Sequence, residues 1–299
     1  MFNSTLRLGF ISLLLVTAVS GCNDGGGGGG PAPAVLGFSG TTTAAAIDSS
    51  NADTLGLAAT EAVNFGITSN NNPLGSSGLV MKAKDSVGFI RQKAASAETA
   101  GQPKLAAQTI PGDCGGSATM NGDLTSGSIV YNNFCMDMDF GFTGTPDPIL
   151  ISGSISYFDD NATFQRMTFT NVTIIYQGET FTFSGGFEYD YVNMTTTEFS
   201  DFRGTDGTVY RVENADVIGD NATGYTVNAR IYHPTHGYVD ITTYPALKFN
   251  CAPAWQPSEG SITVADSLGN TVEVVFNSCT DATITSTIGG TVVANTHTW

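Results

Sequence analysis

The second part of the chain is built on an alternation of apolar and polar residues. In 149–157, 180–191 and 225–231 almost every second side chain is aliphatic or aromatic, and mostly small polar residues stand between them. A period of two places one side of each strand in a core and the other in water, as in antiparallel sheets. Residues 111–299 show no helical crossover of the kind that a parallel sheet needs. The sequence therefore predicts a mainly β domain over 111–299.

Turn signals separate the alternating segments and set the number of strands. They include Gln177-Gly178, Asp206-Gly207, Asp220-Asn221 and Gly269-Asn270. Such pairs favour tight reversals, and one falls about every 10 to 20 residues. We predict about 12 to 14 antiparallel strands joined mostly by hairpins, arranged as a sandwich, an open curved sheet or a barrel-like body.

Four cysteines in the β domain are expected to form two disulfides. Four cysteines allow three pairings. The segments GSATMNGDLTSGSIVYNNFC and GSITVADSLGNTVEVVFNSC resemble each other, each being a strand, a turn and a second strand that ends in Cys. We therefore predict the pairs Cys114–Cys135 and Cys251–Cys279, each at the end of a hairpin. A zinc site is the alternative, but no short C-x-x-C spacing is present. The likeness of the segments also suggests an imperfect duplication, although Thr/Gly/Val-rich strands imitate each other easily.

Residues 48–110 have a helical pattern and form a small helical or partly ordered region. Ser49 or Ser50 is suited to the N-cap of a first helix with Asp53 in its first turn. One face of that helix is apolar, made by Leu55, Ala58, Ala59, Ala62 and Val63. A second helical run over 79–97 has Val80, Val87 and Ile90 on its apolar side.

The amino terminus has the layout of an export signal. One basic residue precedes an apolar stretch that is too short to span a bilayer alone, and Ser20-Gly21-Cys22 follows it. These residues resemble the bacterial lipobox, which implies a signal peptide over 1–21, acylation of Cys22 and anchoring in a membrane. Asn23 after the cysteine favours the outer membrane. Residues 22–47 are rich in Gly, Pro and Ala and are predicted to be a flexible tether.

The chain is acidic, with a net charge of −16. Residues 105–299 contain five basic and 21 acidic side chains. Such a surface repels nucleic acid and anionic headgroups, so nucleic-acid binding is not expected. Divalent cations are its natural counterions, and no other cofactor is indicated.

Several segments taken together resemble a group of uncharacterised β-rich surface lipoproteins of Gram-negative bacteria. They are the lipobox, the oligoglycine stretch, IDSSNADTLGLAA, the cysteine-bracketed GSATMNG hairpin and HPTHGYVDITTYPAL. The resemblance implies a lipid-anchored location in the cell envelope, exposed at the cell surface, and β architecture. It brings no activity and no ligand site with it.

The candidate metal ligands are His233, His236 and Asp240. The two imidazoles are three residues apart in His-Pro-Thr-His, between two predicted strands, and can share a transition metal if the turn converges them. A plain turn at Pro234 accounts for the same residues.

Other polar and aromatic groups have simpler explanations. Asp137 and Asp139 alternate on a strand, and the oxygen-rich segments 159–161 and 220–221 lack the spacing of a calcium loop. The aromatic rows in 164–169 and 181–191 can line a sugar or lipid groove, but core packing is their default role. No G-x-S-x-G elbow is present, and no catalytic residues are assigned.

These features favour a non-catalytic binding or structural protein at the cell surface, with a polysaccharide or an envelope protein as partner. The first alternative is a periplasm-facing carrier that holds an apolar ligand under a curved sheet. The second is an enzyme acting on extracellular glycans. A concave apolar pocket would favour the carrier, and a convergent pair of carboxylates in a cleft would favour the enzyme.

Overall fold

The computed structural model describes residues 36–72, 76–77, 79–99, 107–138, 147–160, 162–176, 179–193, 195–220, 222–251 and 257–298. The predicted signal peptide, Cys22 and most of the predicted tether lie outside these residues. Two helices, α1 (Ala52–Asn70) and α2 (Leu79–Thr99), flank the short strands β1 (Asn71–Asn72) and β2 (Ser76–Ser77). Residues 35–299 form one compact unit.

Fourteen further strands follow the helices in chain order. They are β3 (Gln108–Pro111), β4 (Ser117–Gly122), β5 (Ser126–Met138), β6 (Asp147–Asp159), β7 (Phe164–Tyr176), β8 (Glu179–Asp190), β9 (Thr195–Arg203), β10 (Val209–Asp220), β11 (Gly224–His233), β12 (Gly237–Thr243), β13 (Gly260–Ala265), β14 (Thr271–Phe276), β15 (Asp281–Ile288) and β16 (Thr291–Thr298).

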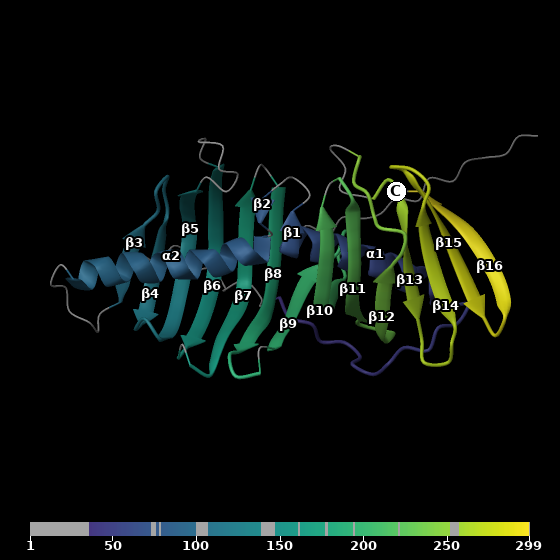
Figure 1. Ribbon diagram of the computed structural model, residues 1–299, viewed down its shortest axis with the longest axis horizontal. Coiled ribbons are helices and arrows are strands. Elements are labelled where there is room, and N and C mark those ends of the chain that lie inside the picture. The colour runs from purple at the N-terminus through teal and green to yellow at the C-terminus, as the bar shows by residue number, and fades with distance from the viewer. Residues whose placement is uncertain are drawn as a thin grey trace, which may run out of the picture. The chain divides into compact units, whose positions relative to one another are not determined.

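All fourteen strands belong to one open antiparallel sheet (Figure 1). Each strand pairs with its neighbours in sequence, from β3 at one edge to β16 at the other. The predicted mainly β architecture and strand number are confirmed. Among the three predicted arrangements the structure is the open sheet, because β3 and β16 do not pair and the described residues contain no other sheet than the two-stranded β1–β2.

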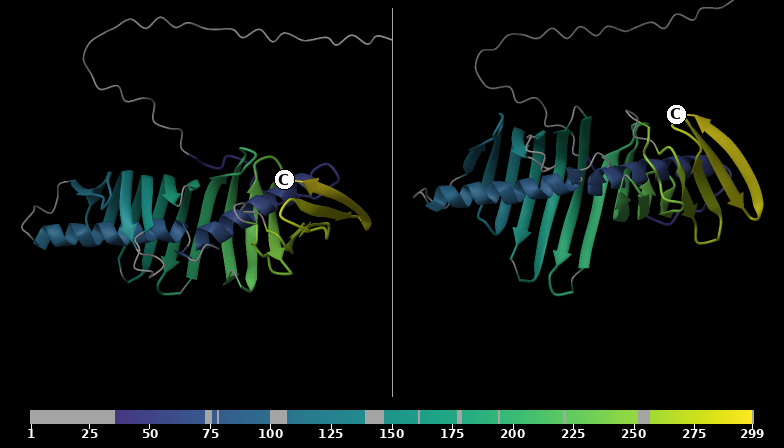
Figure 2. Two further views of the ribbon diagram at one scale, coloured as in Figure 1. Left: turned by 90° about the horizontal axis from the view of Figure 1, so that it is seen from above. Right: turned by 45° about the horizontal axis from the view of Figure 1, so that its top comes forward.

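Both helices lie across the same face of this sheet (Figures 1 and 2). The apolar side of α1 packs on β9 to β15 and is buried through Leu55, Ala59 and Val63. The apolar side of α2 packs on β3 to β8 through Val87 and Ile90. The predicted apolar helix faces are therefore confirmed for these residues, while the side chain of Val80 is outside the described set. The helical region is not separate from the β domain, because burying these faces requires the sheet.

Helix α1 begins later than the predicted N-cap. The Ala52 N–H donates to the carbonyl of Asp48 over 3.0 Å, and the Leu55 N–H donates to the carbonyl of Asn51 over 2.9 Å. Asp48 accepts hydrogen bonds from the backbone N–H groups of Ser50 and Asn51, forming the turn that leads into the helix. Neither Ser49 nor Ser50 is the cap, because the Asp48 turn occupies their positions.

Residues 36–47, which we call the strap, are bound to the sheet. The Phe38 N–H donates to Asp201 over 2.9 Å, and the Ile47 N–H donates to Asp266 over 2.9 Å. Ala44 forms a parallel bridge with Tyr238 at the start of β12. The predicted flexible tether therefore does not extend to residue 47, because fixed acceptors along the sheet satisfy the backbone donors of the strap.

The two predicted disulfides are confirmed. Cys114 is bonded to Cys135 and Cys251 to Cys279. Each bond closes the open end of a hairpin, β4–β5 in the first case and β13–β14 in the second. Duplication of these segments stays a prediction. Neither helix in the described part of the chain combines the length and the apolar character that crossing a bilayer requires.

Candidate functional site

The sheet face opposite the helices, here called the open face, carries the polar side chains of the alternating pattern. Helix-facing positions such as Ile231 and Val239 are buried, while their neighbours Arg230 and Asp240 belong to the other face. Cross-strand pairing therefore decides which side chains meet on the open face.

Two adjacent rows on β9 to β12 form a continuous cluster on the open face, which we call the open-face patch. Their cross-strand order follows from the strand register. The first row is Phe199, Glu213, Arg230 and Asp240, and the second is Asp201, Arg211, Tyr232 and Tyr238.

Two arginines of the open-face patch each form a bidentate ion pair with the carboxylate of a neighbouring strand. Arg211 donates to Asp201 through Nε over 2.7 Å and through Nη2 over 3.1 Å. Arg230 makes the same contacts with Asp240 over 2.7 and 3.0 Å. These bonds raise the pKa of both guanidinium groups above the usual arginine range. The Arg230–Asp240 pair fixes a planar array of donors and acceptors on the surface, whereas Asp201 is only 4% exposed and accepts the N–H of Phe38 in the strap.

Aromatic rings lie against these arginines. The guanidinium carbon of Arg211 is 4.6 Å from the ring centre of Phe199 and 5.5 Å from that of Phe38 in the strap. The guanidinium carbon of Arg230 is 4.0 Å from the ring centre of Tyr238. Stacking on a ring and pairing with a carboxylate hold each arginine in one position.

A groove of about 240 Å³ adjoins the open-face patch and shares Phe199 with it. Its walls carry the cross-strand pair Arg166 and Glu188, whose Nη2 and Oε2 atoms are 2.6 Å apart. Gly186 makes the hollow, since a Cβ at this position would lie 2.7 Å from Cε1 of Phe199. The complete lining is Arg166, Met167, Thr168, Gly186, Phe187, Glu188, Thr197 and Phe199. The groove thus combines an aromatic ring, hydroxyl groups and an exposed arginine–carboxylate pair.

The structure does not bring the three predicted metal ligands together. His233 is buried on the helix side of the sheet, with its ring centre 4.6 Å from that of His236. Asp240 is on the open face and pairs with Arg230. Across the described residues, no cluster of three or more His, Cys, Asp or Glu side chains is arranged to hold a metal ion. Because successive side chains of a strand point to opposite faces, Asp240 on β12 and His233 on β11 lie on opposite sides of the sheet.

Hydrogen bonds within the turn explain the His-Pro-Thr-His segment. Nδ1 of His233 accepts the backbone N–H groups of Thr235 and His236 over 3.1 and 3.3 Å. Burial lowers the pKa of His233, and the nearby His236 lowers it further, while Asp206 opposes the shift. The neutral imidazole is the form that accepts these bonds.

The oxygen-rich turns serve as backbone caps. Asp160 accepts the N–H groups of Ala162 and Thr163, and Asp220 accepts those of Ala222 and Thr223. The Thr163 hydroxyl together with these N–H groups lowers the pKa of Asp160, and the N–H and hydroxyl of Thr223 with the N–H of Ala222 lower the pKa of Asp220. Turn formation, as predicted, accounts for both aspartates. Asp137 is exposed, and Asp139, Asn161 and Asn221 are outside the described residues.

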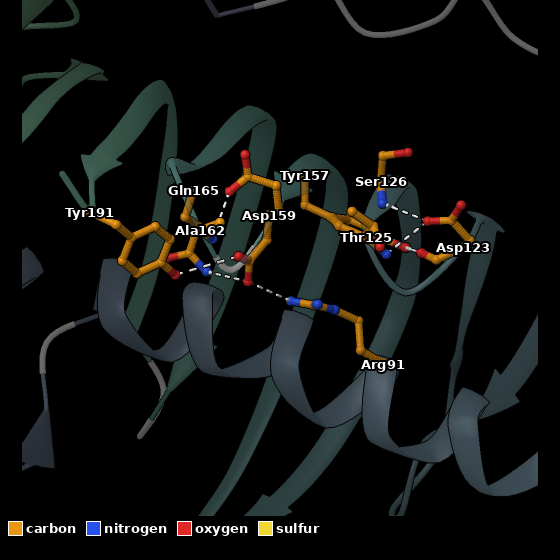
Figure 3. A network of polar contacts seen from close by, with 10 residues as sticks. Arg91, Asp123, Thr125, Ser126, Tyr157, Asp159, Ala162, Gln165 and Tyr191 are labelled. Atoms are coloured by element: carbon orange, nitrogen blue, oxygen red, sulfur yellow. Dashed lines mark hydrogen bonds and ion pairs between the residues drawn. The ribbon is translucent and has the colours of Figure 1, made fainter.

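Asp159, beside one of these turns, joins a network between α2 and the sheet (Figure 3). Arg91 of α2 donates to Asp159 over 3.2 Å, and Gln165 and Tyr191 also donate to this carboxylate. Burial raises the pKa of Tyr157, which lies beside Arg91, to about 12. The network fixes α2 on the sheet and is not open to a ligand through Asp159, which is only 5% exposed.

The predicted aromatic rows divide between the two faces. Phe169 and Phe183 are buried under the helices, and Phe181 and Phe187 pack against the same core, as their default role predicted. Phe164 stacks with Phe158 at 5.1 Å between ring centres. The sequence interpretation missed Phe199 and its arginine neighbours, although the alternation in 195–203 does place Phe199 and Asp201 on one face.

Comparison of the chain with protein-family models, with curated proteins and with solved structures finds no match to any of them.

Proposed function

We propose that this chain is a non-catalytic binding protein of the cell envelope, anchored through acylated Cys22, that uses the open sheet face to bind a polysaccharide. The observation that carries the proposal is the groove at Phe199 next to the open-face patch. Aromatic rings pack against the C–H faces of sugar rings, and fixed arginine–carboxylate pairs match the spacing of neighbouring hydroxyl groups.

A neutral polysaccharide fits this surface better than an acidic one. Arg166, Arg211 and Arg230 are each neutralised by a carboxylate on the next strand. The chain as a whole has a net charge of −16, which opposes the approach of an anionic polymer. The open face is also long enough to present several sugar-sized positions along its strands.

The apolar-carrier alternative has less support. A carrier needs an apolar cavity, and the layer between the helices and the sheet is filled by side chains such as Leu55, Val63, Ile90 and Phe183, all at 1% exposure or less. The enzyme alternative also has less support. The carboxylates of Glu188, Asp201 and Asp240 are all held in ion pairs with arginines.

Affinity electrophoresis tests the binding proposal. The full chain, purified in detergent micelles, is run through gels that contain galactomannan, xyloglucan, dextran or alginate. We expect retardation by at least one neutral polymer, weakened at least tenfold by Phe199→Ala. The matched control is Arg203→Gln, since Arg203 contacts the turn carbonyl of Gly207 and is not part of the groove.

Three results would contradict the binding proposal: no retardation by any neutral polymer, retardation by alginate alone, or equal binding by Phe199→Ala. The anchoring proposal is tested separately. Mass spectrometry of the mature protein should find acylated Cys22 as its first residue, and external protease should cleave the protein on intact cells. A mature product without acyl mass would refute the anchor but not the groove.

A further inference from the structure

The strand β16 forms one edge of the sheet and, within the described residues, pairs on one side only. It pairs with β15 through eight residues, from Thr291 opposite Ile288 to Thr298 opposite Asp281. In the part of the chain that the structure describes, no strand lies on its other side. All of its residues are exposed except His297, which is half-buried. Val292 is 62% exposed and Val293 49%.

The hairpin geometry identifies which backbone groups face outward. Gly289 and Gly290 form a two-residue turn, so the closing pair of Ile288 and Thr291 exchanges backbone hydrogen bonds. Alternation then directs the N–H and C=O groups of every second residue away from β15. These residues are Val292, Ala294, Thr296 and Thr298.

This edge lacks the features that protect sheet edges against pairing. Proteins commonly place lysine, proline or a bulge on such strands. The strand β16 has the sequence TVVANTHT, and its register with β15 is continuous. By contrast, the opposite edge strand β3 has four residues and includes Pro111, which has no N–H to donate.

The absence of charged residues at this edge favours a second copy of β16 as the partner strand. Residues 282–299 contain no Asp, Glu, Lys or Arg, although the chain carries a net charge of −16. Two copies can therefore approach at this edge with less repulsion than at their acidic surfaces. Two-fold antiparallel pairing can set Val292 opposite Thr298 of the second copy and Ala294 opposite Thr296 of the second copy, which uses all four outward residues. All four side chains are small or β-branched and suit a strand.

We infer that the protein forms a two-fold symmetric dimer in which the β16 strands of two copies pair edge to edge and join their sheets into one. The dimer places the open faces of both copies on one continuous sheet surface. It does not depend on the proposed polysaccharide binding, because β16 lies four strands away from β12, the last strand of the open-face patch.

Sedimentation velocity of the full chain in detergent micelles tests this inference. We expect a dimer whose dissociation constant rises at least tenfold in Ala294→Pro, which removes an outward N–H, and in Thr296→Lys, which adds a charge at the edge. Thr285→Lys is the matched control, since Thr285 lies opposite Ala294 on the inner strand β15. This control should dimerise like the unmodified chain.

The second variant covers the case in which Ala294→Pro disturbs folding, because Thr296→Lys leaves every backbone group in place. Three results would overturn the inference. They are a monomer at all concentrations, a dimer unaffected by Thr296→Lys, or open-ended oligomers that grow with concentration, as pairing of β3 with β16 would produce.

Discussion

The ion pair between Arg91 and Asp159 provides a quantitative test of how α2 is held on the sheet. The perturbation is Arg91→Met, which removes the charge and keeps a long apolar side chain beside the ring of Tyr157. Arg91 and Asp159 are 3.2 Å apart, with side-chain exposures of 21% and 7%. The substitution leaves a buried carboxylate whose remaining donors include the neutral groups of Gln165 at 3.3 Å and Tyr191 at 3.4 Å.

The expected magnitude lies between those of exposed and fully buried pairs. Opposite charges about 4 Å apart attract by about 4 kcal/mol at an effective dielectric constant of 20, and desolvation offsets part of this energy. Breaking a buried pair costs about 3–5 kcal/mol, whereas exposed pairs contribute about 0–1 kcal/mol. We expect Arg91→Met to lower the free energy of unfolding by about 2–3 kcal/mol. Asp159→Asn should cost less, because Arg91 can turn toward water.

A double-mutant cycle measures the coupling energy between Arg91 and Asp159, which we expect to be about 1–2 kcal/mol. It uses urea unfolding of the two single variants and of the double variant Arg91→Met/Asp159→Asn. Amide hydrogen exchange should accelerate in α2 more than in α1. The matched control is Arg166→Met, which breaks an exposed pair with side-chain exposures of 57% and 43% and should cost less than about 1 kcal/mol. A cost for Arg91→Met no greater than that of the control, or additive single variants, would refute the reasoning.

Three further predictions concern a disulfide, the pH dependence of stability and the backbone conformation of two glycines. Replacing Cys251 and Cys279 by serine removes a disulfide with a sequence separation of 28 residues and should lower the free energy of unfolding by about 3–4 kcal/mol. Urea titration measures this loss, and a value below about 1 kcal/mol would contradict the loop-entropy argument. Burial holds the folded-state pKa of His233 below the usual histidine value of about 6.5, so the unfolded chain binds the proton more tightly and stability should fall as pH drops below about 6.5. The melting temperature of His233→Gln should depend less on pH in this range, and an unchanged pH dependence would refute this. Gly153 has φ of 106°, and a Cβ would lie 2.3 Å from the carbonyl oxygen of Asn171, so Gly153→Ala should lower the free energy of unfolding by about 2–3 kcal/mol. Gly88 faces open space on α2, so Gly88→Ala should raise the free energy of unfolding by about 0.5–1 kcal/mol. Similar melting temperatures for the two variants would contradict this difference.

The sequence determined the features that depend on local pattern. The period of two in segments such as 225–231 predicts antiparallel strands because each strand buries one face wherever it is placed. The helical face of Leu55 and Val63 follows from spacing in the same way. The disulfide pairing was also predictable, because each cysteine pair brackets one hairpin and hairpin ends are close in any arrangement of the sheet.

Only the tertiary structure decided what depends on register and on distant segments. Local alternation is the same in a sandwich, a barrel and an open sheet, so it did not show that β3 and β16 are the two edges of the described sheet. The pairing of Arg211 with Asp201 depends on which residues of β9 and β10 stand opposite each other, as does the separation of Asp240 from His233. The groove at Phe199 needs three strands in register and the absence of a side chain at Gly186, and a one-residue slip would move these groups to opposite faces.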